Sequence, residues 1–155
     1  MKSEIAFGED WLRLTRIFDA PRPMLFKWWT TGERLQQWFG IRGMTRCEIE
    51  TDFRVGGLFK QSMQMAGGGE FKSSGVYEEI IIPEKIVYRT TFGATSTRVT
   101  VDFIELGKRT KLILNHEGPV DRTTVERMSK GTESALDMLD ELVRKEVMQP
   151  GEDQP

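Results

Sequence analysis

The chain has 155 residues, of which 38% are hydrophobic and 30% charged, a composition typical of a single globular domain with a core of its own. Its net charge of -2 lacks the basic excess of a nucleic-acid-binding protein, and no run of about 18 apolar residues is present that could span a membrane. With one cysteine, Cys47, and one histidine, His116, the chain can form no internal disulfide and offers no zinc or haem ligand set, so we predict no metal, no cofactor and no catalytic triad.

The first regular element is a strand over residues 11–18, where hydrophobic and polar side chains alternate. A proline-containing turn follows, and because proline is tolerated in the first turn of a helix, we predict a short helix over residues 22–30. Thr31 can cap a second short helix over residues 32–38. Residues 1–10 are expected to form an N-terminal extension that precedes the domain.

A period of two begins at Thr45 and continues to His116, interrupted by turn residues such as the Gly67–Gly69 run. This pattern predicts six strands joined by short connections, which is typical of an antiparallel meander with one face exposed to water. Together with the strand over residues 11–18, these segments predict a seven-stranded antiparallel sheet.

The strongest local signal is an amphipathic helix that begins after Asp121, a good N-cap residue, with apolar side chains at spacings of three and four. Roughly 26 helical residues measure about 39 Å, whereas a nine-residue strand measures about 30 Å. One helix can therefore cross the whole sheet. We expect a single domain over residues 11–147, followed by a disordered tail over residues 148–155.

These elements predict an α+β fold in which the sheet curls around the long C-terminal helix, with two short helices between the first two strands. A sheet curled on one helix tends to leave a space beneath it, and ligand cavities are mostly apolar with a few polar groups. The inward-facing side chains have this character. We expect the cavity to be lined by Trp38, Phe59, Gln61, Met63, Phe71, Ser73, Tyr77, Tyr88, Thr90, Val101, Phe103, His116, Met128, Thr132 and Leu136.

Four segments are similar to motifs of a known family: RIFDAPRPMLFKWWTTGERLQQWFG, ETDFRVGG, GVYEEIIIPEKIVY and KRTKLILNHEG. They resemble the SRPBCC, or START-like helix-grip, superfamily, and in particular bacterial relatives of the C-terminal domain of the activator of the heat-shock chaperone ATPase. The resemblance covers residues 11–147 and implies the helix-grip fold, although this superfamily hosts many functions. Many relatives carry Gly-Trp early in the last helix, where this chain has Gly131 and Thr132, a difference that should enlarge or reshape the space under the helix.

The function that we favour at this stage is non-catalytic binding of a small hydrophobic or amphipathic ligand, in the reducing, cytoplasmic compartment that a lone cysteine suggests. A chaperone partner, bound through an ATPase-activator-like interaction module, is the alternative that the resemblance implies. A further alternative is polyketide cyclase/aromatase-like or hydrolase activity, with acid–base candidates Tyr77, Glu79, Tyr88 and His116. A homodimer also stays open, because Ile104 and Ile113 are expected to face outward.

Overall fold

The computed structural model describes residues 3–39, 44–92, 95–118 and 120–149. The chain first forms a β-hairpin, then short helical turns, then six further strands and one long helix. The elements are β1 (Glu4–Phe7), β2 (Trp11–Phe18), α1 (Arg22–Phe26), the 3-10 helix η1 (Lys27–Trp29), α2 (Gly32–Leu35), β3 (Met44–Thr51), β4 (Leu58–Met65), β5 (Glu70–Ile81), β6 (Lys85–Phe92), β7 (Thr95–Leu106), β8 (Arg109–Glu117) and α3 (Arg122–Met148).

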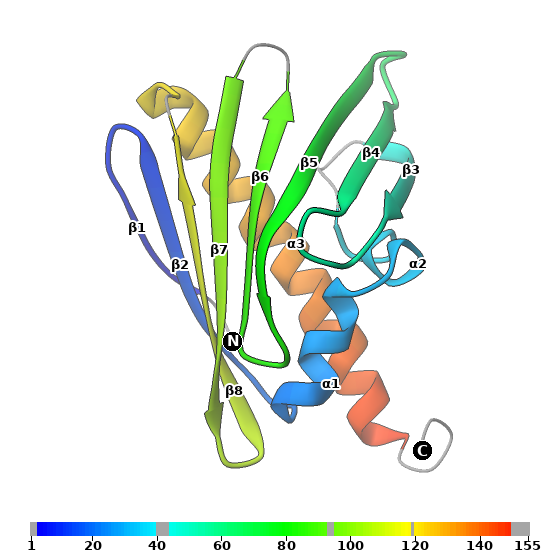
Figure 1. Ribbon diagram of the computed structural model, residues 1–155, viewed down its shortest axis with the longest axis vertical. Coiled ribbons are helices and arrows are strands. Elements are labelled where there is room, and N and C mark those ends of the chain that lie inside the picture. The colour runs from blue at the N-terminus through cyan, green and yellow to red at the C-terminus, as the bar shows by residue number, and fades with distance from the viewer. Residues whose placement is uncertain (1–2, 40–43, 93–94, 119, 150–155) are drawn as a thin grey trace.

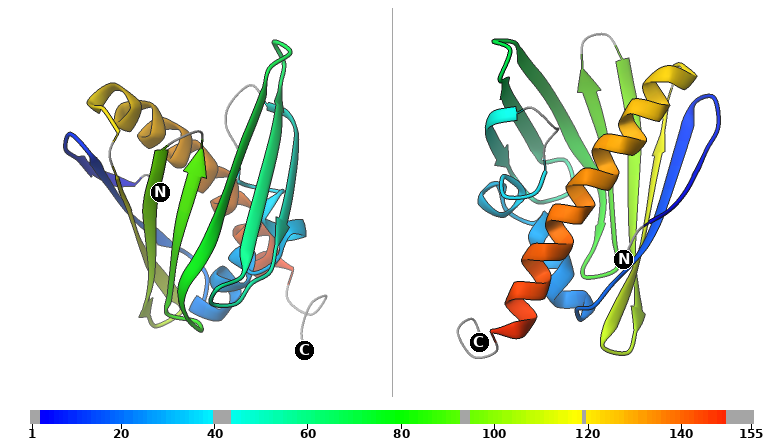
Figure 2. Two further views of the ribbon diagram at one scale, coloured as in Figure 1. Left: turned by 45° about the horizontal axis from the view of Figure 1, so that its top comes forward. Right: turned by 180° about the vertical axis from the view of Figure 1, so that it is seen from behind.

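All the strands of the described ranges belong to one antiparallel sheet, in the order β1-β2-β8-β7-β6-β5-β4-β3. The β3 to β8 run is a meander, and β8 then pairs with β2, so the hairpin β1-β2 extends the sheet at its far edge (Figure 1). The sheet curls, and α3 lies diagonally across its concave face, with the last turns of α3 beside α1 (Figure 2). No helix in the described part of the chain is both long and apolar enough to cross a bilayer.

The predicted α+β helix-grip architecture is confirmed, but the sheet has eight strands instead of the predicted seven. The additional strand is β1, which lies in the segment expected to be an extension and pairs with β2 from Glu4↔Thr15 to Phe7↔Leu12. Its four residues are largely exposed and show no alternation of buried and exposed side chains, so hydrophobic periodicity did not predict this strand. The edge of β2 nevertheless needs a hydrogen-bonding partner, and β1 supplies one.

The helical segments differ slightly from their predicted lengths. The first predicted helix is divided into α1 and η1, and α2 is capped as expected, by the Thr31 hydroxyl accepting from the Arg34 amide at 3.2 Å, but ends at Leu35. Asp121 caps α3 by accepting from the Thr124 amide at 2.7 Å. The predicted tail began at residue 148, but Met148 is the last residue of α3. Residues 150–155 of that tail lie outside the described residues.

Polar contacts anchor α3 at two places along its length. Arg16 of β2 is 1% exposed and pairs with Glu133 and with Asp137, to which its Nη2 donates at 2.7 Å. Near the C-terminal end of α3, Glu146 accepts from Trp28 Nε1 at 3.1 Å and pairs with Lys27. These contacts tie the helix to β2 and to η1. Glu133 and Asp137 lie near the middle of α3, and Glu146 lies near its C-terminal end.

The solid core fills the part of the molecule where α1 and the second half of α3 meet the sheet. Phe26 and Phe103 pack edge to face with ring centroids 5.0 Å apart, and Leu136, Leu139 and Val143 of α3 are fully buried. Val101 and Phe103 also belong to this core, at 0% and 2% exposure. Apolar side chains from α1, α3 and β7 therefore meet directly here. In the first half of α3, Val125 is buried as well, but Met128 and Thr132 line a cavity.

Candidate functional site

A cavity of about 490 Å³ lies between the first half of α3 and the concave face of the sheet. Strands β4 to β8 supply its floor, α3 supplies its roof, and the segment from η1 to the turn after α2 closes one side. A space of this size lies within the range of small-molecule sites. Its lining comprises Trp29, Trp38, Phe39, Phe59, Gln61, Met63, Phe71, Ser73, Tyr88, Thr90, Val99, Leu114, His116, Thr124, Arg127, Met128, Gly131, Thr132, Ala135 and Leu136.

The structure brings most of the sequence-predicted lining residues around this one cavity and leaves three of them out. Tyr77 lines a smaller pocket of about 30 Å³ that adjoins the cavity. Val101 and Phe103 face inward, as their alternation implied, but line neither space. They lie in the solid core because the inner face of β7 passes from the cavity at Val99 into the packed half of the molecule.

Sequence reasoning missed other lining residues, and for some of these a signal existed. Val99 and Leu114 lie two residues before Val101 and His116, on the same face of their strands. The α3 residues Thr124, Gly131 and Ala135 lie at helical spacings from Met128 and Thr132. Trp29 and Phe39 are different. They come from the segment between β2 and β3, whose position over the sheet is a tertiary feature that periodicity does not report.

An aromatic cluster forms the wall where the cavity meets the small pocket. The Phe59 ring packs edge to face on Tyr88 with centroids 5.2 Å apart, and tilts against Tyr77 at 5.6 Å. Phe59 lies over its cross-strand partner Gly75, where an added Cβ would stand 2.4 Å from Phe59 Cε1 and 2.3 Å from the Arg89 carbonyl oxygen. Glycine at position 75 therefore allows the ring to lie flat against the sheet.

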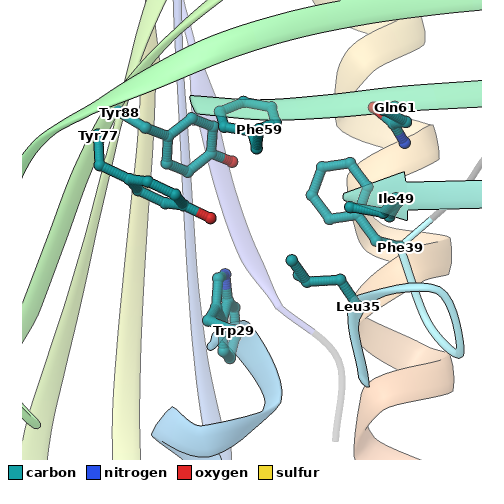
Figure 3. Close-up of a pocket in the computed structure, with 8 residues that line it drawn as sticks. All are labelled: Trp29, Leu35, Phe39, Ile49, Phe59, Gln61, Tyr77 and Tyr88. Atoms are coloured by element: carbon teal, nitrogen blue, oxygen red, sulfur yellow. The ribbon is translucent and has the colours of Figure 1, made fainter. Parts of the chain in front are cut away.

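The small pocket is enclosed by side chains from opposite sides of the molecule. Phe59, Tyr77 and Tyr88 face Leu35, Phe39 and Ile49, and Trp29 closes the space from η1 (Figure 3). The Tyr77 hydroxyl shares a hydrogen bond with Thr51 Oγ1 at 3.0 Å. Burial raises the pKa of Tyr77, and that hydrogen bond offsets part of the effect. A volume of about 30 Å³ has room for little more than one water molecule.

Gln61 is the most deeply buried amide of the cavity, with 6% of its surface exposed. Its Oε1 accepts from Ser73 Oγ at 2.9 Å, across the β4–β5 pairing. Its Nε2 has no hydrogen-bond partner among the residues that the structure describes. The amide lies beside the Cys47 thiol, whose pKa is raised by burial and partly lowered by this amide, but a thiol sulfur is a weak acceptor. Because an amide nitrogen carries two N–H groups, Gln61 keeps at least one buried N–H without an oxygen or nitrogen acceptor among the described residues.

The remaining titratable groups leave the cavity interior uncharged near neutral pH. His116 Nε2 is 2.7 Å from Thr97 Oγ1, and burial lowers the pKa of His116 to about 4. Burial also raises the pKa of Tyr88, with a further contribution from Tyr77, so that its phenol stays protonated. Among the residues that line the cavity, Arg127 carries a positive charge, and this side chain is exposed on the first turns of α3.

The acid–base candidates are not gathered as a catalytic group. Glu79 is 46% exposed and pairs with Lys85 at 3.2 Å, away from the cavity, while Tyr77 and His116 are engaged with Thr51 and Thr97. A histidine with a pKa near 4 is also a weak base at neutral pH. Within the described ranges, no three His, Cys, Asp or Glu side chains lie together as metal ligands would. The cavity lining is therefore mostly apolar, with a few uncharged polar side chains and one exposed arginine, Arg127.

Known proteins share this architecture. The chain superposes on a protein from Chromobacterium violaceum with a TM-score of 0.81 and 28% identity, over 86% of this chain and 97% of that one. An AHSA1 protein from Silicibacter pomeroyi gives a TM-score of 0.74 and 26% identity, over 88% and 99%. A protein from Arthrobacter aurescens, at 16% identity, shows the fold alone, with a TM-score of 0.80 over 98% of both chains. Among curated proteins, none is similar enough to match.

The family assignment follows from the sequence itself. Residues 19–144 match the family described as "Activator of Hsp90 ATPase homolog 1-like protein". This range begins directly after β2 and includes all later strands and most of α3. The matched range contains the cavity lining in full. It also agrees with the resemblance found in the four motifs. The chain therefore belongs to the family of activator of Hsp90 ATPase homolog 1-like proteins.

Proposed function

We propose that this protein binds a small, largely apolar ligand in the cavity under α3, without catalysing its conversion. The observation that carries the proposal is the 490 Å³ cavity itself, because most of its lining is aromatic or aliphatic and its interior polar groups are uncharged. Apolar surface removed from water contributes roughly 25 cal/mol per Å², so a ligand that fills such a space gains affinity without any ion pair. The free thiol of Cys47 suits the reducing compartment of the cytoplasm, where we place this activity.

The way in which α3 is held supports this function. Arg16 binds Glu133 and Asp137, so the turns of α3 that carry Thr132 over the cavity are held by a residue outside the cavity lining. Thr124 and Arg127 line the cavity near the start of α3, and Arg127 is exposed, which makes this end the polar rim. An amphipathic ligand would keep its polar end here and bury its apolar body deeper.

The test is native mass spectrometry of protein purified without detergent or organic solvent. A bound apolar compound, released on denaturation and absent from the variant Thr132→Trp, is the expected result, because an indole at position 132 would occupy the cavity. The matched control is Met138→Trp, which adds the same indole on the same helix at a side chain that is 46% exposed. Empty wild-type protein that also takes up no compound from a lipid and aromatic library would refute the proposal.

The family description also raises the chaperone activator as a second interpretation. That activity would depend on the protein surface, so filling the cavity should leave it unchanged. Stimulation of the chaperone ATPase by wild type and by Thr132→Trp alike, with no compound bound to either, would favour the activator module over ligand binding.

A further inference from the structure

We propose that the Gln61 amide selects ligands that carry an uncharged hydrogen-bond acceptor, such as a ketone or lactone carbonyl, at the inner end of the cavity. The inference rests on the proposed function and adds to it the chemical class of the ligand. It starts from one atom, Gln61 Nε2, which is buried, lines the cavity and has no hydrogen-bond partner among the described residues.

The orientation of this amide is set by the protein. Ser73 Oγ donates to Gln61 Oε1 at 2.9 Å, which fixes the oxygen end of the amide towards β5 and leaves the nitrogen end free. Both residues line the cavity and are cross-strand partners in the β4–β5 ladder. In Figure 3, Gln61 lies across the pocket from Tyr77, with its amide oxygen on the side of Phe59 and its amide nitrogen on the side away from Phe59. Ser73 is thus a positioning residue for the Gln61 donor.

An unused buried donor is costly, and a ligand oxygen would relieve that cost. A buried amide N–H that lacks a partner loses the hydrogen bonds it made with water, and a site built around such a donor rejects analogues that cannot accept from it. A water molecule inside the cavity competes for the same donor, which limits the gain from a ligand acceptor to the net value of one buried hydrogen bond. That value corresponds to about a tenfold preference.

The surroundings favour a neutral acceptor over a carboxylate. No cationic side chain is among the inner lining residues, and Arg127 stands exposed on the first turns of α3. An anion that binds at Gln61 would be transferred from water to a site that offers no positive charge to pair with it. The free energy of that transfer is far larger than the gain from one amide hydrogen bond. A carbonyl oxygen needs only the donor. The aromatic neighbours Phe59 and Tyr88 suit a flat apolar body attached to it.

The experiment compares three probes of one shape: 9-fluorenone, which has a carbonyl, fluorene, which lacks it, and fluorene-9-carboxylate, which is charged. Equilibrium dialysis against the full chain measures each dissociation constant. We expect wild type to bind fluorenone about tenfold more tightly than fluorene, and the carboxylate more weakly than either. In Gln61→Met, the preference for fluorenone over fluorene should disappear, and fluorene should bind more tightly than in wild type, because it no longer covers an unpaired donor. Ser73→Ala should reduce the preference without removing it.

Each other outcome contradicts the inference in a recognisable way. If wild type binds fluorenone and fluorene equally, or if Gln61→Met keeps the preference, the amide does not select the ligand, although the cavity still binds. If the carboxylate binds most tightly, the acceptor is anionic and the proposed class is wrong. If Gln61→Met does not fold, Gln61→Leu gives the same comparison. If no probe enters wild type, the binding function itself fails, and the inference with it.

Discussion

His116 makes the stability of this protein depend on pH in a direction that the structure determines. Burial in the cavity wall lowers its pKa from 6.5 to about 4, so in the folded chain the imidazole stays neutral at pH 5. In the unfolded chain, the imidazole has its ordinary pKa of about 6.5. Between pH 6.5 and pH 4, the unfolded chain therefore binds more protons than the folded chain. The free energy of unfolding must then fall as the pH falls from 6.5 towards 4, and recover as the pH rises.

The size of this effect follows from the two pKa values. Integrating the difference in bound protons gives a loss of about 2 kcal/mol at pH 5, rising to about 3 kcal/mol below pH 4, relative to neutral pH. This is a substantial fraction of the 5–15 kcal/mol that stabilises an ordinary domain. The variant His116→Gln keeps a polar side chain near Thr97 but cannot take up the proton. It should lack this component and lose stability on acidification only through its carboxylates.

The assay is urea unfolding of wild type and His116→Gln at about pH 7.5 and about pH 5. The pH-dependent loss should be about 2 kcal/mol larger in wild type, a double difference from which the carboxylates shared by both proteins cancel. Because the chain has one histidine, an NMR titration of its single imidazole reports the folded-state pKa directly. Thr97→Val is the control: since burial is the cause, the pKa should stay low without the hydroxyl. Equal losses in both proteins, or an imidazole that titrates above pH 6, would refute the reasoning.

Three further substitutions test the packing that shapes the site. Arg16→Met should lower the free energy of unfolding by about 3 kcal/mol, because Glu133 and Asp137 lose the buried guanidinium that pairs with them. Urea unfolding measures this loss, and the control Arg16→Lys, which keeps a positive charge, should lose less. Gly75→Ala should cost about 1–3 kcal/mol and shift the Phe59 ring into the cavity, seen as weaker fluorene binding; unchanged binding would contradict the contact. Glu146→Ala should remove the Trp28 hydrogen bond and speed amide exchange in the last turns of α3 by about tenfold or more, whereas exchange at the start of α3 should stay constant.

Local patterns were sufficient for most of the architecture. Alternation located β2 and β3 to β8 because one face of each strand packs inward, and helical spacing located α3 because one of its faces is buried. The same two periodicities identified inward-facing residues such as Gln61 and Met128. They failed for β1, whose four residues pair at an exposed edge and bury no face. A strand without a buried face leaves no alternation to read.

The sequence by itself determined which side chains face inward, which family the chain resembles and that one helix is long enough to cross the sheet. Only the tertiary structure decided where inward-facing means a wall of the cavity and where it means solid core, as for Val99 and Phe103 on the same strand. That distinction depends on where α1, η1 and α3 come to rest over the sheet. Their positions are set by contacts between residues far apart in sequence, such as Arg16 with Asp137 and Trp28 with Glu146, and no periodicity records these contacts.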